Sequence, residues 1–223
     1  MQTEEIICNA APEKEYIPPE PKPGYEFCKR IFDVVMSTFA LIVLSPALLI
    51  VALIIWAQDG GSPLYYQTRL TKGGKEFHMY KFRSMCVDAD KKLEELMKYN
   101  TMEGPAFKME NDPRITKFGR FIRKTSIDEL PQLINIIRGE MSIIGPRPPL
   151  PREVEQYTPY QLHRLDVITG LACYHECQGR SDDKNFDHWV ESDLKYIRER
   201  SMLTDLKVIF WTIRVVLTGK GAM

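Results

Sequence analysis

One segment near the N-terminus is apolar almost without interruption. Between Ile31 and Trp56 the only charged residue is Asp33, close to the start of the segment. As a helix, the segment would be about 39 Å long at about 1.5 Å per residue. That length exceeds the roughly 30 Å hydrocarbon core of a bilayer. The pattern therefore predicts a helix in contact with lipid, and a single transmembrane span is the simplest interpretation.

Two features favour a helix that enters the membrane and leaves by the same face. Pro46, near the middle, removes one helical hydrogen bond and so breaks or kinks the helix, while the Ser45 hydroxyl can satisfy a backbone group that the break leaves unpaired. A spanning helix should carry its basic residues on one side, whereas here both flanks are basic. We therefore expect a re-entrant helix broken at Ser45-Pro46. The flanking cations are Lys29, Arg30, Arg69, Lys72, Lys75, Lys81 and Arg83.

The remaining pattern predicts a β-hairpin and an amphipathic C-terminal helix. Pro63 to Arg83 contain two strand-like runs around a turn at residues 72–74. The C-terminal helix is too short to span a bilayer. It fits either a helix in the membrane interface, with Trp211 at headgroup depth, or an amphipathic core helix. Its apolar positions are Leu206, Ile209, Phe210, Ile213, Val216 and Leu217.

The expected fold class is α+β and predominantly helical. It is a monotopic membrane protein with a re-entrant helix, a small β-hairpin and interfacial amphipathic helices. The formal net charge of +0 argues against a nucleic-acid partner. The five cysteines are odd in number and scattered, so we expect reduced thiols facing a cytosol. The first residues lack a secretory signal and are rich in proline, which predicts an extended, flexible arm.

The stretch from Phe118 to Pro148 holds the candidate chemistry. Its apolar spacing predicts a helix with one buried face, and Gly139 suits the end of that helix. Pro131 is tolerated only in a first turn, so the helix begins close to residues 126–128. Asp128 and Glu129 therefore lie at a helix N-terminus. The apolar positions are Leu130, Leu133, Ile134 and Ile137.

The Asp128-Glu129 pair has a structural and a chemical interpretation. Ser126 to Glu129 match the S-x-x-E capping box, which taken alone favours a helix cap. The cations around the pair favour chemistry, because arginine binds phosphate oxygens in a bidentate manner. They are Arg120, Arg123, Lys124 and Arg147, the last held between Pro146 and Pro148.

Adjacent carboxylates beside a phosphate site suit phosphoryl transfer. An aspartate can attack phosphorus and carry a covalent intermediate. A diphosphate substrate needs a divalent cation, and Mg²⁺ binds one or two carboxylates plus substrate phosphates. We therefore expect Asp128 and Glu129 to act as catalytic residues and as ligands of Mg²⁺.

Several motifs, in order, resemble the bacterial sugar transferase family, the small monotopic phosphoglycosyl transferases. The resemblance extends from Lys29 to about Leu217. It departs at VITGLACYHECQGRSD, residues 167–182, where the family often has a PGITGW-like run. The motifs are KRIFD (29–33), Ser45-Pro46, YKFRSM (80–85), SIDELPQL (126–133) and GEMSIIGPRP (139–148).

The resemblance implies a reaction and assigns roles. The family transfers a phosphosugar from a UDP-sugar to a polyprenol phosphate such as undecaprenyl phosphate, with Mg²⁺, an aspartyl phosphosugar intermediate and release of UMP. Asp128 would be the nucleophile and Glu129 the supporting acid. The substrate-binding candidates are Lys81, Arg83, Arg123, Pro146, Arg147, Pro148 and Arg180.

The resemblance also implies an organisation of the chain. We expect a Pro-rich arm (1–28), the re-entrant membrane helix (29–57) and a catalytic domain with C-terminal interfacial helices (58–223). The location would be the cytoplasmic face of a bacterial inner membrane, and a homodimer is left open. The multi-span module of larger relatives is not expected, so the chain resembles a minimal catalytic unit.

Two other functions stay open. In a non-catalytic membrane adaptor, the Asp-Glu pair would only cap a helix. A membrane phosphatase would release free sugar phosphate without a lipid acceptor. A metal site at Cys173, His175 and Cys177 is disfavoured, because three ligands at C-x-H-x-C spacing lack a paired C-x2-C arrangement.

Overall fold

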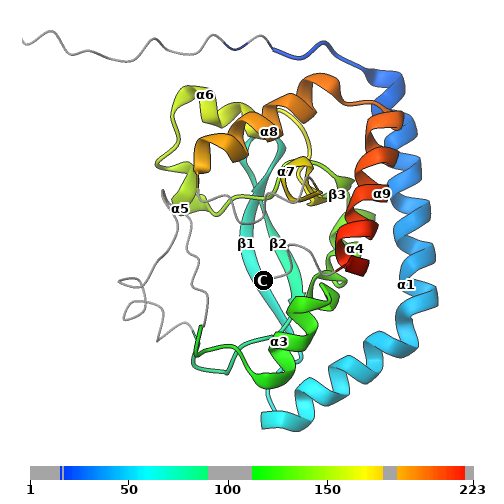
Figure 1. The fold of residues 1–223 in the computed structure, drawn as a ribbon, viewed down its shortest axis with the longest axis vertical. Coiled ribbons are helices and arrows are strands. Elements are labelled where there is room, and N and C mark those ends of the chain that lie inside the picture. Colours follow the sequence, from blue (N-terminus) through cyan, green and yellow to red (C-terminus); the bar gives the residue numbers. More distant parts are fainter. Residues whose placement is uncertain (1–15, 17, 90–111, 178–184, 219–223) are drawn as a thin grey trace, which may run out of the picture.

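The chain forms a predominantly helical structure around two small sheets (Figure 1). The computed structural model describes residues 16, 18–89, 112–177 and 185–218. The predicted α+β, mainly helical class is confirmed. The longer elements are α1 (Pro23–Asp59), β1 (Leu64–Thr71), β2 (Lys75–Phe82), α3 (Lys117–Lys124), α4 (Gln132–Arg138), α8 (Phe186–Glu199) and α9 (Met202–Thr218). The shorter elements are β3 (Ser142–Ile144), α5 (Pro151–Val154), α6 (Pro159–Leu162), β4 (Gly170–Ala172) and α7 (Tyr174–Cys177).

The long apolar segment forms the helix α1, which bends part way along its length (Figure 1). It begins at Pro23 and ends at Asp59, so it extends beyond the expected 29–57 at both ends. Pro46 leaves the carbonyl of Ile42 without its helical donor, and the Ser45 hydroxyl donates to that oxygen at 2.8 Å. The helix is long and apolar enough to cross a membrane, and only 11% of its most apolar window is buried. This large exposed apolar surface supports a membrane location.

The polar residues at the start of α1 attach it to the rest of the chain. Lys29 pairs with Asp205 of α9 at 2.9 Å, and α9 lies beside α1 in Figure 1. Arg30 donates to the carbonyl oxygens of Ile136 and Ile137 at the C-terminal end of α4. The Asp33 carboxylate accepts the backbone N–H of Ile143, the middle residue of β3, at 3.1 Å. The one charged residue of the apolar segment is therefore a structural contact.

The predicted hairpin is confirmed. β1 and β2 pair antiparallel from Leu64↔Phe82 to Thr71↔Lys75. The turn at residues 72–74 needs positive φ at Gly73 and Gly74, which glycine adopts without a steric penalty. Along the free edge of β2, buried Asn135 of α4 accepts the N–H of Tyr80 and donates to the carbonyl of His78. The hairpin is therefore bound to the helix that follows the Asp-Glu pair.

A second, parallel sheet joins β3 to β4, and the sequence patterns did not predict it. The strands meet at two glycines in close contact. A Cβ at Gly170 would lie 2.0 Å from the backbone nitrogen of Gly145. Only residues without a side chain allow this approach.

The predicted helix after the Asp-Glu pair is confirmed as α4, with corrections to its start and to its buried face. It begins at Gln132 rather than close to residues 126–128, because Ile127–Glu129 form a separate 3-10 turn. Gly139 ends it at φ 82°, as expected. Leu133 and Ile136 are buried, but Ile134 is 36% exposed rather than buried. The inner face instead contains Gln132 and Asn135, because α4 packs against the backbone edge of β2 and needs polar groups there.

The C-terminal helix α9 combines the two alternatives that the sequence left open. Val208 is fully buried, and Trp211 packs inward with its ring 6.3 Å from that of Tyr174. Trp211 is therefore partly buried against the core, and its depth in a membrane stays a prediction. An outer apolar strip stays exposed, as an interfacial helix requires. It consists of Leu203, Leu206, Phe210 and Ile213; the side chains of Val216 and Leu217 lie outside the described part.

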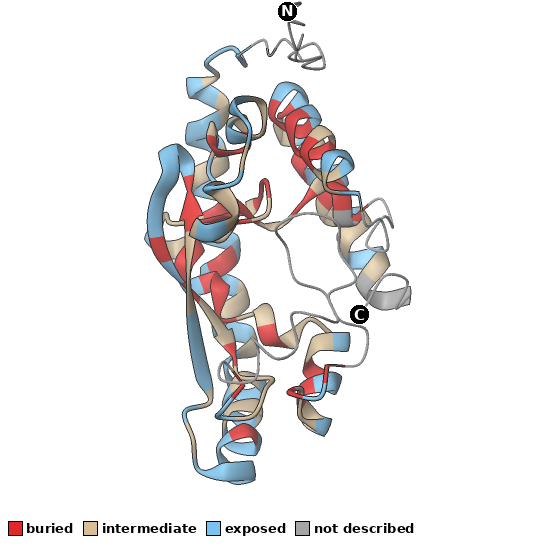
Figure 2. Ribbon diagram, turned by 90° about the vertical axis from the view of Figure 1, so that its left-hand side faces the viewer, coloured by how far each residue is buried: buried red, intermediate tan, exposed pale blue. Residues whose placement is uncertain are grey.

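Buried residues concentrate where these elements meet (Figure 2). One cluster joins α8, α9 and β3, a second joins β2 and α4, and a third joins α1, α3 and β2. The described part of the N-terminal arm is also attached. Tyr16 stacks on His163 at 3.6 Å and donates to Asp166 at 2.8 Å.

Candidate active site

The Asp-Glu pair lies on a tight turn immediately before α4. Ile127–Glu129 form one turn of 3-10 helix, preceded by Ser126 at φ 56°. Ser126 is the one non-glycine residue with positive φ in the described part of the chain, a conformation that side chains disfavour. Its side chain makes no capping hydrogen bond, and the Glu129 carboxylate binds Lys81 instead. The capping-box interpretation is therefore wrong.

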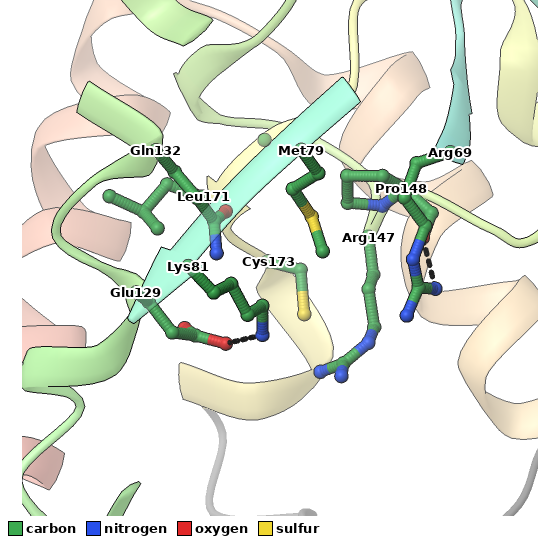
Figure 3. A pocket seen from close by; sticks show the side chains of 10 residues that line it. Arg69, Met79, Lys81, Glu129, Gln132, Arg147, Pro148, Leu171 and Cys173 are labelled. Carbon is green, nitrogen blue, oxygen red and sulfur yellow. Dashed lines mark hydrogen bonds and ion pairs between the residues drawn. The ribbon is translucent and has the colours of Figure 1, made fainter. Parts of the chain in front are cut away.

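A pocket opens beside this turn, between the hairpin and the loop that follows β3 (Figure 3). Lys81 of β2 reaches across to Glu129, with 2.6 Å between Nζ and Oε1. Figure 3 shows the Lys81 ammonium, the Cys173 thiol and the Arg147 guanidinium extending toward the same space. The lining residues are Arg69, Met79, Lys81, Glu129, Gln132, Arg147, Pro148, Gly170, Leu171 and Cys173.

The loop that carries Arg147 is held by backbone hydrogen bonds on both sides. On one side Gly170 donates to the carbonyl of Pro146 at 2.8 Å. On the other side Leu70 of β1 donates to the carbonyl of Pro149 at 3.0 Å. Arg69 adds a bond to the carbonyl of Pro148 at 2.9 Å. The prolines restrict φ, so the loop is rigid for two independent reasons.

The two acids have opposite electrostatic environments. Burial raises the pKa of Asp128 to about 6, and the charge of Glu129 adds to this, although Lys81 opposes it. Burial also raises the pKa of Glu129, but the charges of Lys81 and Arg147 outweigh burial and leave it below the ordinary value. Asp128 forms no ion pair with a described cation. At neutral pH the structure therefore holds a buried, ionised Asp128 carboxylate without a counter-ion in contact.

The structure brings most of the predicted site residues together. Lys81, Glu129, Arg147 and Pro148 line one pocket, and Pro146 of the same loop is buried. Asp128 lies next to Glu129, and the positive charge of Arg123 acts on both carboxyls.

Among the described candidates, Arg83 does not line this pocket, and neither do Asp128, Arg123 and Pro146. Arg83 pairs with Asp59 at the end of α1. It is bound to the membrane helix rather than directed at the pocket. Arg180 lies outside the described residues.

Arg69, Gln132 and Cys173 line the pocket and were missed by the sequence analysis. The period-two alternation of the hairpin could have identified Arg69. Positions 65, 67 and 69 of β1 face the same side as 81, 79 and 77 of β2. Gln132 and Cys173 carried no comparable signal, because only the fold brings α4 and the segment after β4 to one pocket.

The two adjacent carboxylates suit a hard divalent cation that also binds oxygen atoms of the substrate. No group of three or more His, Cys, Asp and Glu gathers into a metal site within the described ranges. Mg²⁺ does not need such a group, because it binds through one or two carboxylates plus phosphate oxygens and water. Asp128 and Glu129 fit that requirement.

The chain belongs to the bacterial sugar transferase family, whose model matches residues 24–219. It is 42% identical over 204 residues to the galactosyl transferase CpsE of Streptococcus agalactiae, covering 90% of this chain and 44% of that protein. It is 38% identical over 208 residues to the undecaprenyl-phosphate galactose phosphotransferase of Salmonella typhimurium, covering 90% and 43%. It is 40% identical over 198 residues to the exopolysaccharide production protein ExoY of Sinorhizobium fredii, covering 87% of each. The chain thus spans less than half the length of the first two relatives.

Proposed function

We propose that this chain transfers a phosphosugar from a UDP-sugar to a polyprenol phosphate such as undecaprenyl phosphate. The observation that carries the proposal is a buried Asp128 carboxylate beside a pocket lined by Lys81, Arg69 and Arg147. A desolvated carboxylate is a stronger nucleophile than a hydrated one, and the cations suit a diphosphate. The family and the names of the relatives agree with this chemistry.

The reaction would proceed in two displacements at one phosphorus atom. An oxygen of Asp128 attacks the β-phosphorus of the UDP-sugar, and the bond between that phosphorus and the bridging oxygen breaks, releasing UMP. An oxygen of the polyprenol phosphate then attacks the same phosphorus, and Asp128 leaves as a carboxylate. Lys81 and Arg147 offset the negative charge that gathers on the phosphoryl oxygens.

Asp128 and Glu129 would hold Mg²⁺, which when bound neutralises charge on the diphosphate. The Lys81 contact fixes the direction of the Glu129 carboxylate. Because Glu129 has a lowered pKa, it stays ionised at neutral pH and can serve as a ligand.

We further propose that α1 is re-entrant and that the pocket faces the cytoplasm at a bacterial inner membrane. The bend of α1, the Ser45 contact to Ile42 and the exposed strip of α9 support this placement. Accessibility of introduced cysteines tests it, after replacement of the native cysteines. Cysteines at Glu20 and Lys75 should react from the cytoplasmic side only. Labelling of the two positions from opposite sides would require a transmembrane span.

The activity test is UMP release across a panel of UDP-sugars, with undecaprenyl phosphate and Mg²⁺ present. Relatives are named for galactose, glucose and N-acetylgalactosamine, so those sugars lead the panel. Asp128→Asn should lose UMP release, and the matched change at exposed Asp187 on α8 should not. Absence of UMP with every donor favours the membrane adaptor. Free sugar phosphate without acceptor favours the phosphatase.

A further inference from the structure

We propose that Arg69 is a diphosphate-binding residue of this pocket and acts with Arg147 on one anion. This inference deepens the proposed function and rests on it. Neither the sequence motifs nor the comparisons single out Arg69. Its place on β1 follows from the hairpin register, and its place in the pocket follows from the fold.

The guanidinium of Arg69 is held in a fixed position at the wall of the pocket. One nitrogen donates to the carbonyl of Pro148 and another to the side chain of Gln67, each at 2.9 Å. Nε is buried and has no hydrogen-bond partner among the described residues. Arginine has five N–H donors, so donors remain for a ligand. A fixed arginine with donors to spare loses little entropy when it binds a phosphate.

Charge gives the second argument. The described lining carries three cations, Arg69, Lys81 and Arg147, and one carboxylate, Glu129, so cations outnumber carboxylates on the pocket wall. Burial and the neighbouring charge of Arg147 lower the pKa of Arg69 to about 10, so at neutral pH both guanidiniums stay charged and repel each other. An anion between them would remove that repulsion. The diphosphate of a nucleotide-sugar carries two negative charges, which suits a pocket wall on which cations outnumber carboxylates.

Equilibrium binding of UDP and UMP to the full-length chain in detergent tests the proposal, because neither probe has a sugar to transfer. Arg69→Gln should weaken UDP binding by about tenfold to a hundredfold, the range for a lost hydrogen bond to a charged group. The affinity for UMP should fall less, because UMP lacks the second phosphoryl group. Arg69→Lys keeps the positive charge but not the forked geometry of the guanidinium, so its UDP affinity should lie between those of the wild type and Arg69→Gln. Arg198→Gln, at an exposed position on α8, is the matched control and should bind as the wild type.

A purely structural role of Arg69, through the Pro148 carbonyl, has a different result. Arg69→Gln would then lower the melting temperature and weaken the binding of UDP and of UMP equally. Arg69→Lys would bind both nucleotides no better than Arg69→Gln does. That result overturns the proposal, as does unchanged UDP affinity in Arg69→Gln. If Arg69→Gln does not fold, Arg69→Lys still tests the proposal. A larger loss of affinity for UDP than for UMP supports it, and equal losses overturn it.

Inorganic pyrophosphate separates this inference from the proposed function. Pyrophosphate should raise the melting temperature of the wild type, and it should raise the melting temperature of Arg69→Lys by a smaller amount. If the wild type binds no uridine nucleotide but shows this difference, the proposed function fails and the anion site stands. If pyrophosphate shifts both proteins equally, the role of Arg69 fails whatever the enzyme transfers.

Discussion

At the scale of single residues, Asp128 works against stability. A carboxyl that is 7% exposed and has a pKa of about 6 is less stable ionised in the fold than in water. Ser126, two residues earlier, is held at positive φ. Both features carry a cost in folding free energy, and such costs gather at functional sites. They favour a reactive carboxylate over a helix cap.

Replacing Asp128 with Asn should therefore stabilise the protein while removing activity. The folded pKa lies above the ordinary value of 3.8, so the fold binds the proton more tightly than the unfolded chain does. Stability is then lost as pH rises from about 4 to about 6. At pH 7.5 the variant should gain up to roughly 3 kcal/mol, and at pH 4 almost nothing. Unfolding midpoints in detergent at the two pH values measure this gain.

The opposite sign would support the cap. Loss of a helix cap destabilises by about 1 kcal/mol. Asp187→Asn on α8 serves as the control for loss of one exposed carboxylate.

The pH dependence of the first displacement should report the same carboxylate. Below the pKa of Asp128, the rate of UMP formation without lipid acceptor should fall about tenfold per pH unit, because protonated Asp128 cannot attack. That pKa is about 6 without a metal ion, and a bound Mg²⁺ would lower it. Glu129, with its lowered pKa, should not titrate in this range. Omitting the acceptor removes the titration of its own phosphate. A rate that shows no fall between pH 7 and pH 4 would exclude Asp128 as the titrating nucleophile.

At the scale of elements, the site depends on how the β3–β4 sheet holds the Arg147 loop. Gly145 and Gly170 approach so closely that neither has room for a side chain. The backbone bonds from Gly170 to Pro146 and from Leu70 to Pro149 then place the loop between β4 and β1. The position of Arg147 is therefore set by two strands distant from it in sequence.

Gly170→Ala should destabilise the protein by about 2 kcal/mol or more, because its Cβ would overlap backbone atoms that cannot move aside. UDP affinity should fall with it as the Arg147 loop shifts. Gly24→Ala is the matched control, since no atom lies within 4 Å of its Cβ position in α1. Alanine there should be neutral or slightly stabilising. Melting temperatures and UDP titrations of the two variants measure these effects. Equal changes in Gly170→Ala and Gly24→Ala would contradict the argument from the close contact at Gly170.

At the scale of the whole molecule, the apolar helix α1 is bound directly to α4. Arg30 of α1 donates to the last carbonyls of α4, which begins just after Asp128 and Glu129. Asp33 fixes the approach to β3, and Asp59 binds Arg83 at the other end of α1. The position of α1 in the bilayer therefore sets the position of the site relative to lipid.

Arg30→Met should lower stability by about 1–3 kcal/mol, because the carbonyls of Ile136 and Ile137 lose their charged donor. In membranes the rate of UMP release should fall by a larger factor than UDP affinity falls in detergent. The variant removes a contact between α1 and α4 but leaves the residues that line the pocket unchanged. Arg198→Met on α8 controls for loss of an exposed arginine. An Arg30 variant with unchanged stability would show that these bonds contribute nothing.

The sequence by itself determined the local features: the long apolar helix with a proline inside it, the hairpin, the end of α4 at Gly139, and the Asp-Glu pair with its neighbouring arginines. Each depends on periodicity, on proline or glycine, or on side-chain type within a few residues. The sequence also misassigned Ser126 as a cap and Ile134 as buried. Those errors share one cause, since packing partners distant in the chain decide each position.

Only the tertiary structure decided which cations share the pocket. It paired Lys81 with Glu129, bound Arg83 to Asp59, and brought Arg69 beside Arg147. The strands β3 and β4 are three residues each, too short for any hydrophobic period, and form because two glycines let distant backbones meet. Burial, which shifts the pKa of Asp128, exists only in the folded chain. Residue type supplied the chemistry, and long-range contacts supplied the electrostatic environment in which it can act.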